Sequence, residues 1–226
     1  MATQSNKEAF LGGFKKLLNE QWQADVRLKA GDSDETTSIF AHKLVLVSLL
    51  PLLFYLSSSN YREKWQDQRC KKILESDEFK ASSKQMETVT LSEMKHEELE
   101  AFVEFIYRVD GSICSASLKK HARSLFHAAD KYEIPHLRDL CRNELISSLN
   151  SSNALSILEL AQIPFDKALN DPAFTTIITN ISTIASGDEF KLFVANHPNL
   201  AVDIMKASIT RLSTSRKICG YCNRYY

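Results

Sequence analysis

The residues best suited to chemistry lie near the C-terminus, where Cys219 and Cys222 form a CxxC pair. This spacing fits half of a zinc site or a thiol redox pair. Zinc prefers four ligands, and the sequence holds no second CxxC and no HxxxH that would complete the set. A redox role would need a βαβ context, which the pattern lacks. We therefore expect no cofactor and interpret residues 211–226 as a flexible tail. Metal binding by Cys219 and Cys222, paired across a dimer, is the alternative.

His42 is the other candidate for chemistry, because it follows a predicted strand and opens a predicted helix. A catalytic histidine needs a nucleophile or an orienting carboxylate, and the sequence suggests none. A polar side chain here is better explained as a partner for the unsatisfied backbone groups of the helix start. The sequence contains no Gly-rich phosphate loop, GxSxG, HExxH or kinase signature. We expect no catalytic residues and no enzyme activity.

Composition and charge indicate which kinds of partner the chain is not expected to bind. The 226 residues are 44% hydrophobic and 25% charged, with a net charge of zero and no basic patch of the kind that binds nucleic acid. Five scattered cysteines indicate a reducing compartment, so the expected location is the cytoplasm or the nucleus. The uncharged run of thirteen residues at 44–56 is too short to cross a bilayer, which takes roughly 20 apolar residues. We expect neither a nucleic acid nor a membrane partner.

The elements that position these residues begin with an amphipathic helix over residues 7–22, because large apolar side chains recur there at helical spacing. Alternation of Val26 and Leu28 with charged residues predicts a strand, and residues 38–41 are the expected return strand of a hairpin. Residues 87–91, rich in β-branched side chains, form a third predicted strand. Ser92 is expected to cap the helix that follows and runs to Tyr107.

Two further helices are predicted at 118–131 and 135–149, before a polar stretch that marks a boundary near residue 150. Beyond it we predict helices at 154–162, 164–182 and 188–193, and a last one that begins near His197. The fold class is α+β: a small sheet flanked by helices, then a short all-helical extension. The expected divisions are an N-terminal helix at 1–23, a main domain at 24–150, the extension at 151–210 and the tail.

This order of elements resembles the BTB/POZ family. The matching segments are Ala24-Asp25-Val26, Phe40-Ala41-His42-Lys43, Val89-Thr90-Leu91, Phe105-Ile106-Tyr107 and Leu125-Phe126-His127-Ala128-Ala129-Asp130-Lys131-Tyr132. The part after residue 150 is similar to the BACK-like extension of speckle-type BTB proteins, at Glu189-Phe190 and His197-Pro198-Asn199-Leu200. The resemblance covers roughly residues 8–210. In its detailed sequence the chain resembles the plant members that carry a BTB domain and little else.

The resemblance implies a homodimeric, substrate-specific adaptor of a cullin-3-based E3 ubiquitin ligase that mediates ubiquitination of a client protein. It places the dimer interface at Phe10, Phe14, Leu17, Leu18, Asp25, Lys43 and Val45. Asp25 and Lys43 are expected to form a partly buried ion pair. Cullin contacts are implied at Phe79, Tyr107 and Tyr132, and a second self-association surface, giving higher oligomers, at Leu200, Ile204 and Met205.

The sequence departs from the family pattern in three respects. An insert at about 48–70 separates two helices that the family joins within about six residues. Ala81 stands where cullin-binding members carry an acid, two positions after Phe79. The chain also shows no MATH, Kelch or zinc-finger substrate module. These departures support an alternative function, that of a BTB scaffold or transcriptional co-regulator that does not bind cullin.

Overall fold

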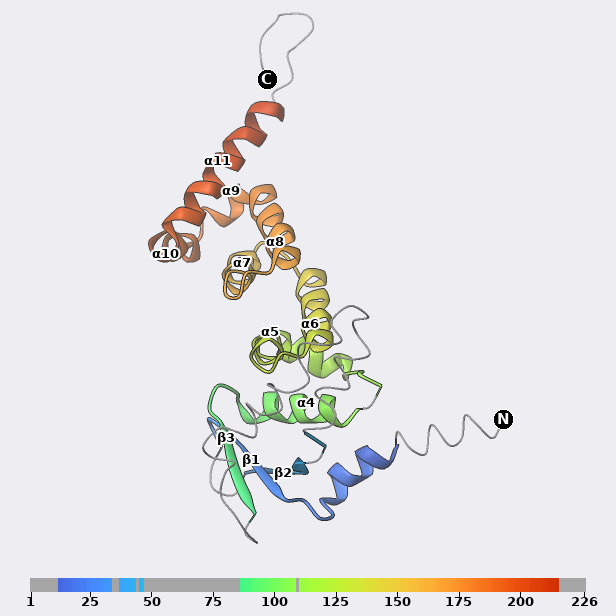
Figure 1. The fold of residues 1–226 in the computed structure, drawn as a ribbon. Helices are drawn as coiled ribbons and strands as arrows, with labels where there is room; N and C mark the ends of the chain where they lie inside the picture. Colours follow the sequence, from blue (N-terminus) through green and yellow to red (C-terminus); the bar gives the residue numbers. More distant parts are fainter. Residues whose placement is uncertain (1–11, 34–36, 44, 47–85, 109, 216–226) are drawn as a thin grey trace, which may run out of the picture. The chain divides into compact units, whose positions relative to one another are not determined.

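The structure is a computed structural model that describes residues 12–33, 37–43, 45–46, 86–108 and 110–215 (Figure 1). The chain divides into two compact units, Met1–Glu144 and Leu145–Tyr226. Several predicted features lie outside the described residues: Phe10, the 48–70 insert, Phe79, Ala81, Cys219 and Cys222.

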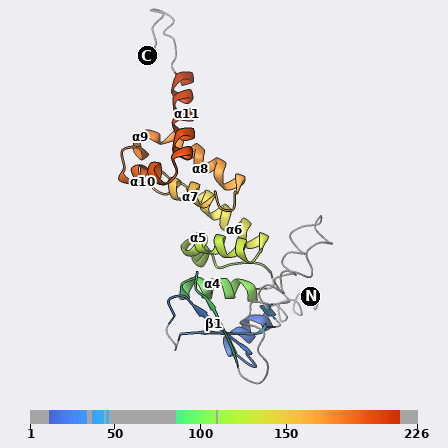
Figure 2. The ribbon, with the colours of Figure 1, turned by 60° about the vertical axis from the view of Figure 1, so that its left-hand side comes forward.

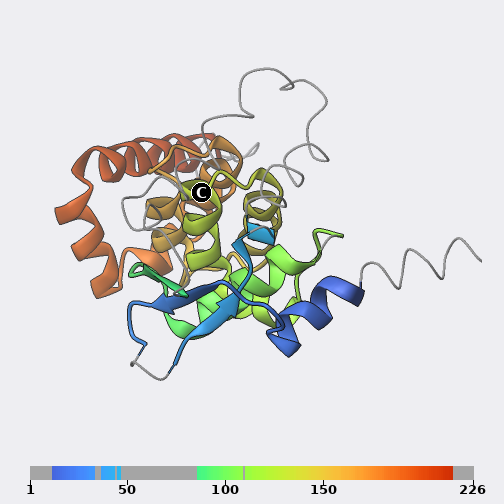
Figure 3. The ribbon, with the colours of Figure 1, turned by 60° about the horizontal axis from the view of Figure 1, so that its bottom comes forward.

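The first unit contains a three-stranded sheet, seen together with the helices of that unit in Figure 3. Its order is β2-β1-β3, with β1 spanning Val26–Ala30, β2 spanning Ile39–Ala41 and β3 spanning Glu87–Leu91. β1 pairs antiparallel with β2 and parallel with β3. Every second residue of β1 is buried, as the alternating pattern predicted. The predicted α+β class, a small sheet with helices, is confirmed.

The turn after β1 fastens the sheet to the next helix. The backbone N–H of Gly31 donates to the carbonyl of Met94 at 2.9 Å, and a Cβ at Gly31 would lie only 2.2 Å from the carbonyl oxygen of Ser92. One residue further, the carboxylate of Asp32 accepts a hydrogen bond of 2.8 Å from the backbone N–H of His96. This bond satisfies one of the unpaired donors at the helix start.

The first unit also contains a helix at residues 12–20 and, after the sheet, α4 at His96–Tyr107, α5 at Ser115–Lys131 and the larger part of α6 at Pro135–Ser147. The predicted cap at Ser92 is wrong, because α4 begins four residues later and Asp32 reaches its first turn from the hairpin. α4 contacts both β1 and α5. The chain leaves α5 through Glu133, whose φ of 55° is left-handed, and Ile134 N–H donates to the carbonyl of Ala129 at 2.7 Å.

In its described part the second unit contains five helices after α6 and no β-strand (Figure 2). Its helices are α7 (Ala154–Leu160), α8 (Lys167–Thr179), α9 (Ile181–Ile184), α10 (Asp188–Asn196) and α11 (Pro198–Ser215). α8 contacts α7, α9 and α11, and α10 contacts α11. The single helix predicted at 164–182 is two helices, because Asn180 leaves the helical conformation and its side chain donates to the carbonyl of Thr176.

None of the helices in the described ranges combines the length and the apolar character that crossing a bilayer requires. The uncharged run at 44–56 lies almost entirely outside those ranges.

Candidate interaction surfaces

The N-terminal helix exposes part of its apolar side. Residues 12–20 are helical, and Phe14, Leu17 and Leu18 are half-buried. The helix ends at Glu20, two residues before the predicted end, because Gln21 takes the left-handed conformation that ends helices, with a φ of 53°. Trp22 therefore lies in the following turn, where 63% of its surface is exposed. The sequence analysis did not single out Trp22 as an interface residue, although its large apolar side chain close to the stripe was a usable signal.

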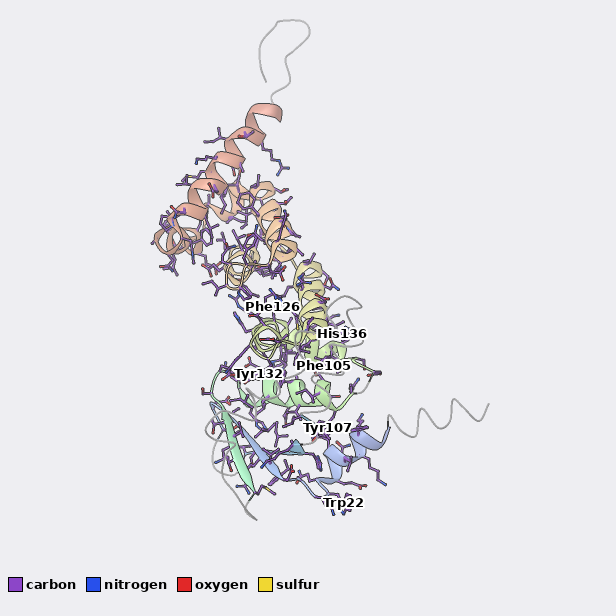
Figure 4. All side chains as sticks on the ribbon, in the orientation of Figure 1. Trp22, Phe105, Tyr107, Phe126, Tyr132 and His136 are labelled. Carbon is purple, nitrogen blue, oxygen red and sulfur yellow. The ribbon has the colours of Figure 1, made fainter. Side chains whose placement is uncertain are left out.

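A partly buried hydrogen-bond cluster holds this turn against the sheet and α4. Figure 4 labels two of the residues that the cluster joins, Trp22 and Tyr107. The Nδ1 atom of His42 lies 2.8 Å from the hydroxyl of Tyr107, and its Nε2 atom lies 2.8 Å from the carbonyl of Trp22. The backbone N–H of His42 also donates to the Tyr107 hydroxyl. Burial raises the pKa of Tyr107 to about 12, so this hydroxyl keeps its proton at neutral pH. In this arrangement His42 serves as a structural residue.

Two predicted dimer residues next to the sheet, Asp25 before β1 and Val45 after β2, differ in their exposure to solvent. Asp25 is exposed, and its carboxylate accepts a hydrogen bond of 2.7 Å from the backbone N–H of Lys43. The expectation of a partly buried pair is therefore wrong for Asp25, whose carboxylate instead satisfies the backbone donor of Lys43, a residue in helical conformation. Val45 is 6% exposed and belongs to the core of its own unit, so it is not available as a surface contact.

The second exposed group joins the turn before α4 to the end of α5. Glu93 accepts hydrogen bonds from the ammonium of Lys131 and, at 2.7 Å, from the hydroxyl of Tyr132. The Tyr132 ring packs on Phe102, with ring centroids 5.4 Å apart. Partial burial would raise the pKa of Glu93, but the bonds from Lys131 and Tyr132 outweigh it and lower that pKa. We call Glu93, Lys131 and Tyr132 the α5-end cluster.

The residues that the resemblance implied for cullin binding differ in burial. Tyr132 is half-buried within the α5-end cluster. Tyr107 is only 1% exposed, and its hydroxyl is used by His42, so its assignment as a surface contact is wrong. Phe79 lies outside the described residues. Glu93 was missed by the sequence analysis, because its partners are 38 and 39 positions away.

The apolar surface of α11 differs from the predicted one. Ile204 is fully buried in the second unit and Leu200 is half-buried, so only Met205, at 46%, is largely exposed. The predicted trio is therefore wrong as a surface, because Ile204 lies one helical step from Met205 and faces the core. Val202 and Ile209 are exposed together with Met205, at positions that share one side of the helix.

The described thiols differ in chemistry, and neither belongs to a metal site. Within the described ranges, no three His, Cys, Asp or Glu side chains are placed to hold a metal ion. Backbone N–H groups of Ser117 and Ala116 lower the pKa of Cys114, at the start of α5. Burial raises the pKa of Cys141 to about 12.

Comparisons with known proteins agree with this fold. The sequence profile of the BTB/POZ domain matches residues 14–149. Three BTB/POZ domain-containing proteins of Arabidopsis thaliana are similar to the chain over most of its length. One is 90% identical over 226 residues, which is all of both chains. A second is 59% identical over 220 residues, or 97% of this chain and 90% of the relative. The third is 65% identical over 175 residues, or 77% of this chain and 94% of the relative.

The family profile and the similarity to these relatives extend over far more of the chain than a short shared motif would. They cover the sheet, α4, α5 and α6. The chain belongs to the BTB/POZ domain family, whose characteristic domain is a protein-interaction module.

Proposed function

We propose that this protein is a substrate-specific adaptor of a cullin-3-based E3 ubiquitin ligase and dimerises through its BTB domain. The adaptor carries no chemistry of its own, and the ligase transfers ubiquitin to the recruited client. The observation that carries the proposal is the α5-end cluster. It contains Tyr132, which among the residues that the resemblance implies for cullin is the one that the structure both describes and leaves partly exposed. The proposal rests on that cluster together with family membership.

The α5-end cluster has the properties of an interface anchor. Aromatic side chains held in one orientation lose little entropy on binding and often contribute most of the affinity. Tyr132 is held by Phe102 beneath its ring and by Glu93 at its hydroxyl. The charge on Lys131 is balanced by the same carboxylate, so a partner that covers the cluster need not bury an isolated ion.

Calorimetry of the full chain with a cullin-3 N-terminal fragment tests the proposal. Tyr132→Ala is expected to weaken binding by about tenfold or more, and Tyr132→Phe by less, because it keeps the ring. Phe79→Ala is also expected to weaken binding. Deletion of residues 49–69 and Ala81→Glu are each expected to strengthen it. Absence of binding even when the deletion and Ala81→Glu are combined would contradict the adaptor role.

Dimerisation is proposed to use the N-terminal helix, where Leu17, Leu18 and Trp22 leave apolar surface in contact with water. Each large apolar side chain that a second copy covers would contribute about 1.5–3 kcal/mol. Light scattering at micromolar concentration is expected to give a dimer. Leu17→Asp with Leu18→Asp should give a monomer, and Asn19→Asp, on the exposed side, should not. A monomeric wild type would refute this part.

A second self-association contact is proposed on α11, through which the BACK-like extension would link dimers into larger assemblies. Its proposed residues are the exposed apolar ones, Val202, Met205 and Ile209, in place of the predicted Leu200, Ile204 and Met205. Sedimentation over a wide concentration range tests it, and dimers alone at every concentration would count against it.

The competing function is a BTB scaffold or transcriptional co-regulator without cullin, and Ala81 is the feature that favours it. Loss of the acid removes a charge-assisted hydrogen bond worth about 1.5–3 kcal/mol. A stable dimer that retains its client and never co-purifies with cullin would support this alternative.

A further inference from the structure

The two faces of the sheet have different surroundings. On β1, Val26, Leu28 and Ala30 are buried, and α4 contacts this strand. Arg27 and Lys29 alternate with them and are half-buried, so their side chains lie on the opposite face. Figure 3 shows the sheet from that side, with α4 behind the strands. We call this side the outer face.

The pairing of the strands places three further side chains beside these two cations. Across the parallel pairing with β3, Thr88 lies opposite Arg27. Thr90 lies opposite Lys29 in the same pairing, and both threonines are exposed. On the other side of β1, Phe40 of β2 lies opposite Arg27. We call these residues the outer-face cluster: Arg27, Lys29, Phe40, Thr88 and Thr90.

Arg27 is held by an aromatic ring rather than by a carboxylate. Its guanidinium carbon lies 5.2 Å from the centroid of the Phe40 ring, a contact that orients the guanidinium plane. The buried Nε atom of Arg27 has no hydrogen-bond partner among the described residues, and within the same ranges neither Arg27 nor Lys29 forms an ion pair. Asp25, the acid nearest to Arg27 in the sequence, has its carboxylate bonded to the backbone N–H of Lys43. An anionic ligand would therefore meet two cations that no described carboxylate neutralises.

We propose that the outer-face cluster binds a phosphoserine or phosphothreonine side chain of a partner protein. Alternate residues of a strand are about 6.6 Å apart, so the long side chains of Arg27 and Lys29 can both reach one phosphate group. A guanidinium binds two phosphate oxygens at once, and the ammonium supplies a second positive charge. Neighbouring strands are about 4.8 Å apart, which leaves the hydroxyls of Thr88 and Thr90 in reach as further donors. Two cations also match the charge of a phosphate monoester, about −1.5 to −2 at neutral pH.

The size of the outer-face cluster favours a single phosphorylated side chain over a polyanion. Arg27 and Lys29 are the only cations in the three strands. A nucleic acid is typically held through about 6–10 phosphate contacts, and an anionic membrane through clusters of about 4–8 Lys and Arg residues. Phosphopeptide binding goes beyond the ubiquitin-ligase role and does not depend on cullin, because no residue of the α5-end cluster belongs to the outer-face cluster.

NMR titration of the full chain with an end-blocked heptapeptide, one phosphoserine between alanines, tests the proposal, and the same peptide with serine is the control ligand. Backbone amide shifts on addition of the phosphopeptide should map to residues 27–29, 40 and 88–90. Arg27→Gln and Lys29→Gln should each weaken binding by about tenfold, the change expected when one charge-assisted hydrogen bond is lost. Lys119→Gln removes the same charge from an exposed position on α5 and should leave the affinity unchanged.

Two further variants separate recognition from misfolding. Arg27→Lys keeps the charge but loses the guanidinium fork, so it should weaken binding by less than Arg27→Gln does. Thr88→Glu adds a carboxylate opposite Arg27 at an exposed position and should weaken binding several-fold. Equal affinity for the serine peptide, no shift at millimolar phosphopeptide, or equal weakening by Lys119→Gln would overturn the proposal. Tighter binding of inorganic phosphate, or of vesicles that contain phosphatidylinositol phosphate, than of the phosphopeptide would overturn it in favour of a free-anion or a membrane site.

Discussion

The hydroxyl of Tyr107 lies 2.8 Å from both the backbone nitrogen and the Nδ1 atom of His42, a residue 65 positions earlier. The backbone N–H can only donate, so the hydroxyl accepts from it. The carbonyl of Trp22 can only accept, so Nε2 carries the ring hydrogen and donates to that carbonyl. In a neutral imidazole Nδ1 is then the acceptor, and the Tyr107 hydroxyl donates its hydrogen to it. These bonds connect the end of α4 to the residue after β2 and to the turn that presents Trp22.

Tyr107→Phe should therefore lower the free energy of unfolding by about 1–3 kcal/mol, because His42 keeps two polar groups whose partner has gone. Urea denaturation measures the change. Tyr132→Phe is the matched control and should cost less, since its hydroxyl bonds to an exposed-side carboxylate that water can solvate. Equal losses in the two variants would contradict the structural role of the Tyr107 hydroxyl.

Alkaline pH should destabilise the protein through the same residue. Tyr107 has a pKa of about 12 when folded, against about 10 in an unfolded chain. Between these values the unfolded state has lost a proton that the folded state retains, so stability is complete below pH 10 and falls as pH rises. The contribution is at most about 2–3 kcal/mol. Denaturation at about pH 8 and about pH 11 should show a smaller decrease for Tyr107→Phe, and parallel decreases would contradict the assignment.

Gly31 should tolerate no side chain. In Gly31→Ala the new Cβ would meet the carbonyl oxygen of Ser92 at 2.2 Å, and the backbone would have to move, at a cost of about 1–3 kcal/mol. Gly13→Ala is the control, because nothing lies within 4 Å of its Cβ position and alanine favours a helix by up to about 1 kcal/mol. Thermal unfolding should move in opposite directions in the two variants.

Prediction from sequence succeeded where structure is set by neighbours along the chain. The alternation of Val26 and Leu28 correctly predicted β1, and proline at position 135 correctly marked the start of α6. Interactions between distant residues were not predictable in this way. Asp32 caps α4 across 64 positions, and local sequence favoured the nearer Ser92 instead.

The candidate site was predicted less well than the fold, for a related reason. Helical spacing shows that Tyr107 and Ile204 are on apolar faces but not whether another element covers those faces. Both are buried, and each was wrongly placed at a surface. Trp22 is exposed because a left-handed turn at Gln21 ends the helix, which spacing alone does not reveal.

Cys114 should be the more reactive of the two thiols that the structure describes. Backbone N–H groups of Ser117 and Ala116 lower its pKa and favour its thiolate, whereas burial keeps Cys141 protonated, with a pKa of about 12. Iodoacetamide reacts with the thiolate, so at about pH 8 alkylation of Cys114 should exceed that of Cys141 by more than about tenfold. Mass spectrometry of the cysteine-containing peptides measures both rates in one sample. Cys114→Ser should remove the fast reaction, and urea should bring the two rates in the wild type together. Fast alkylation of Cys141 in the folded protein would contradict its burial.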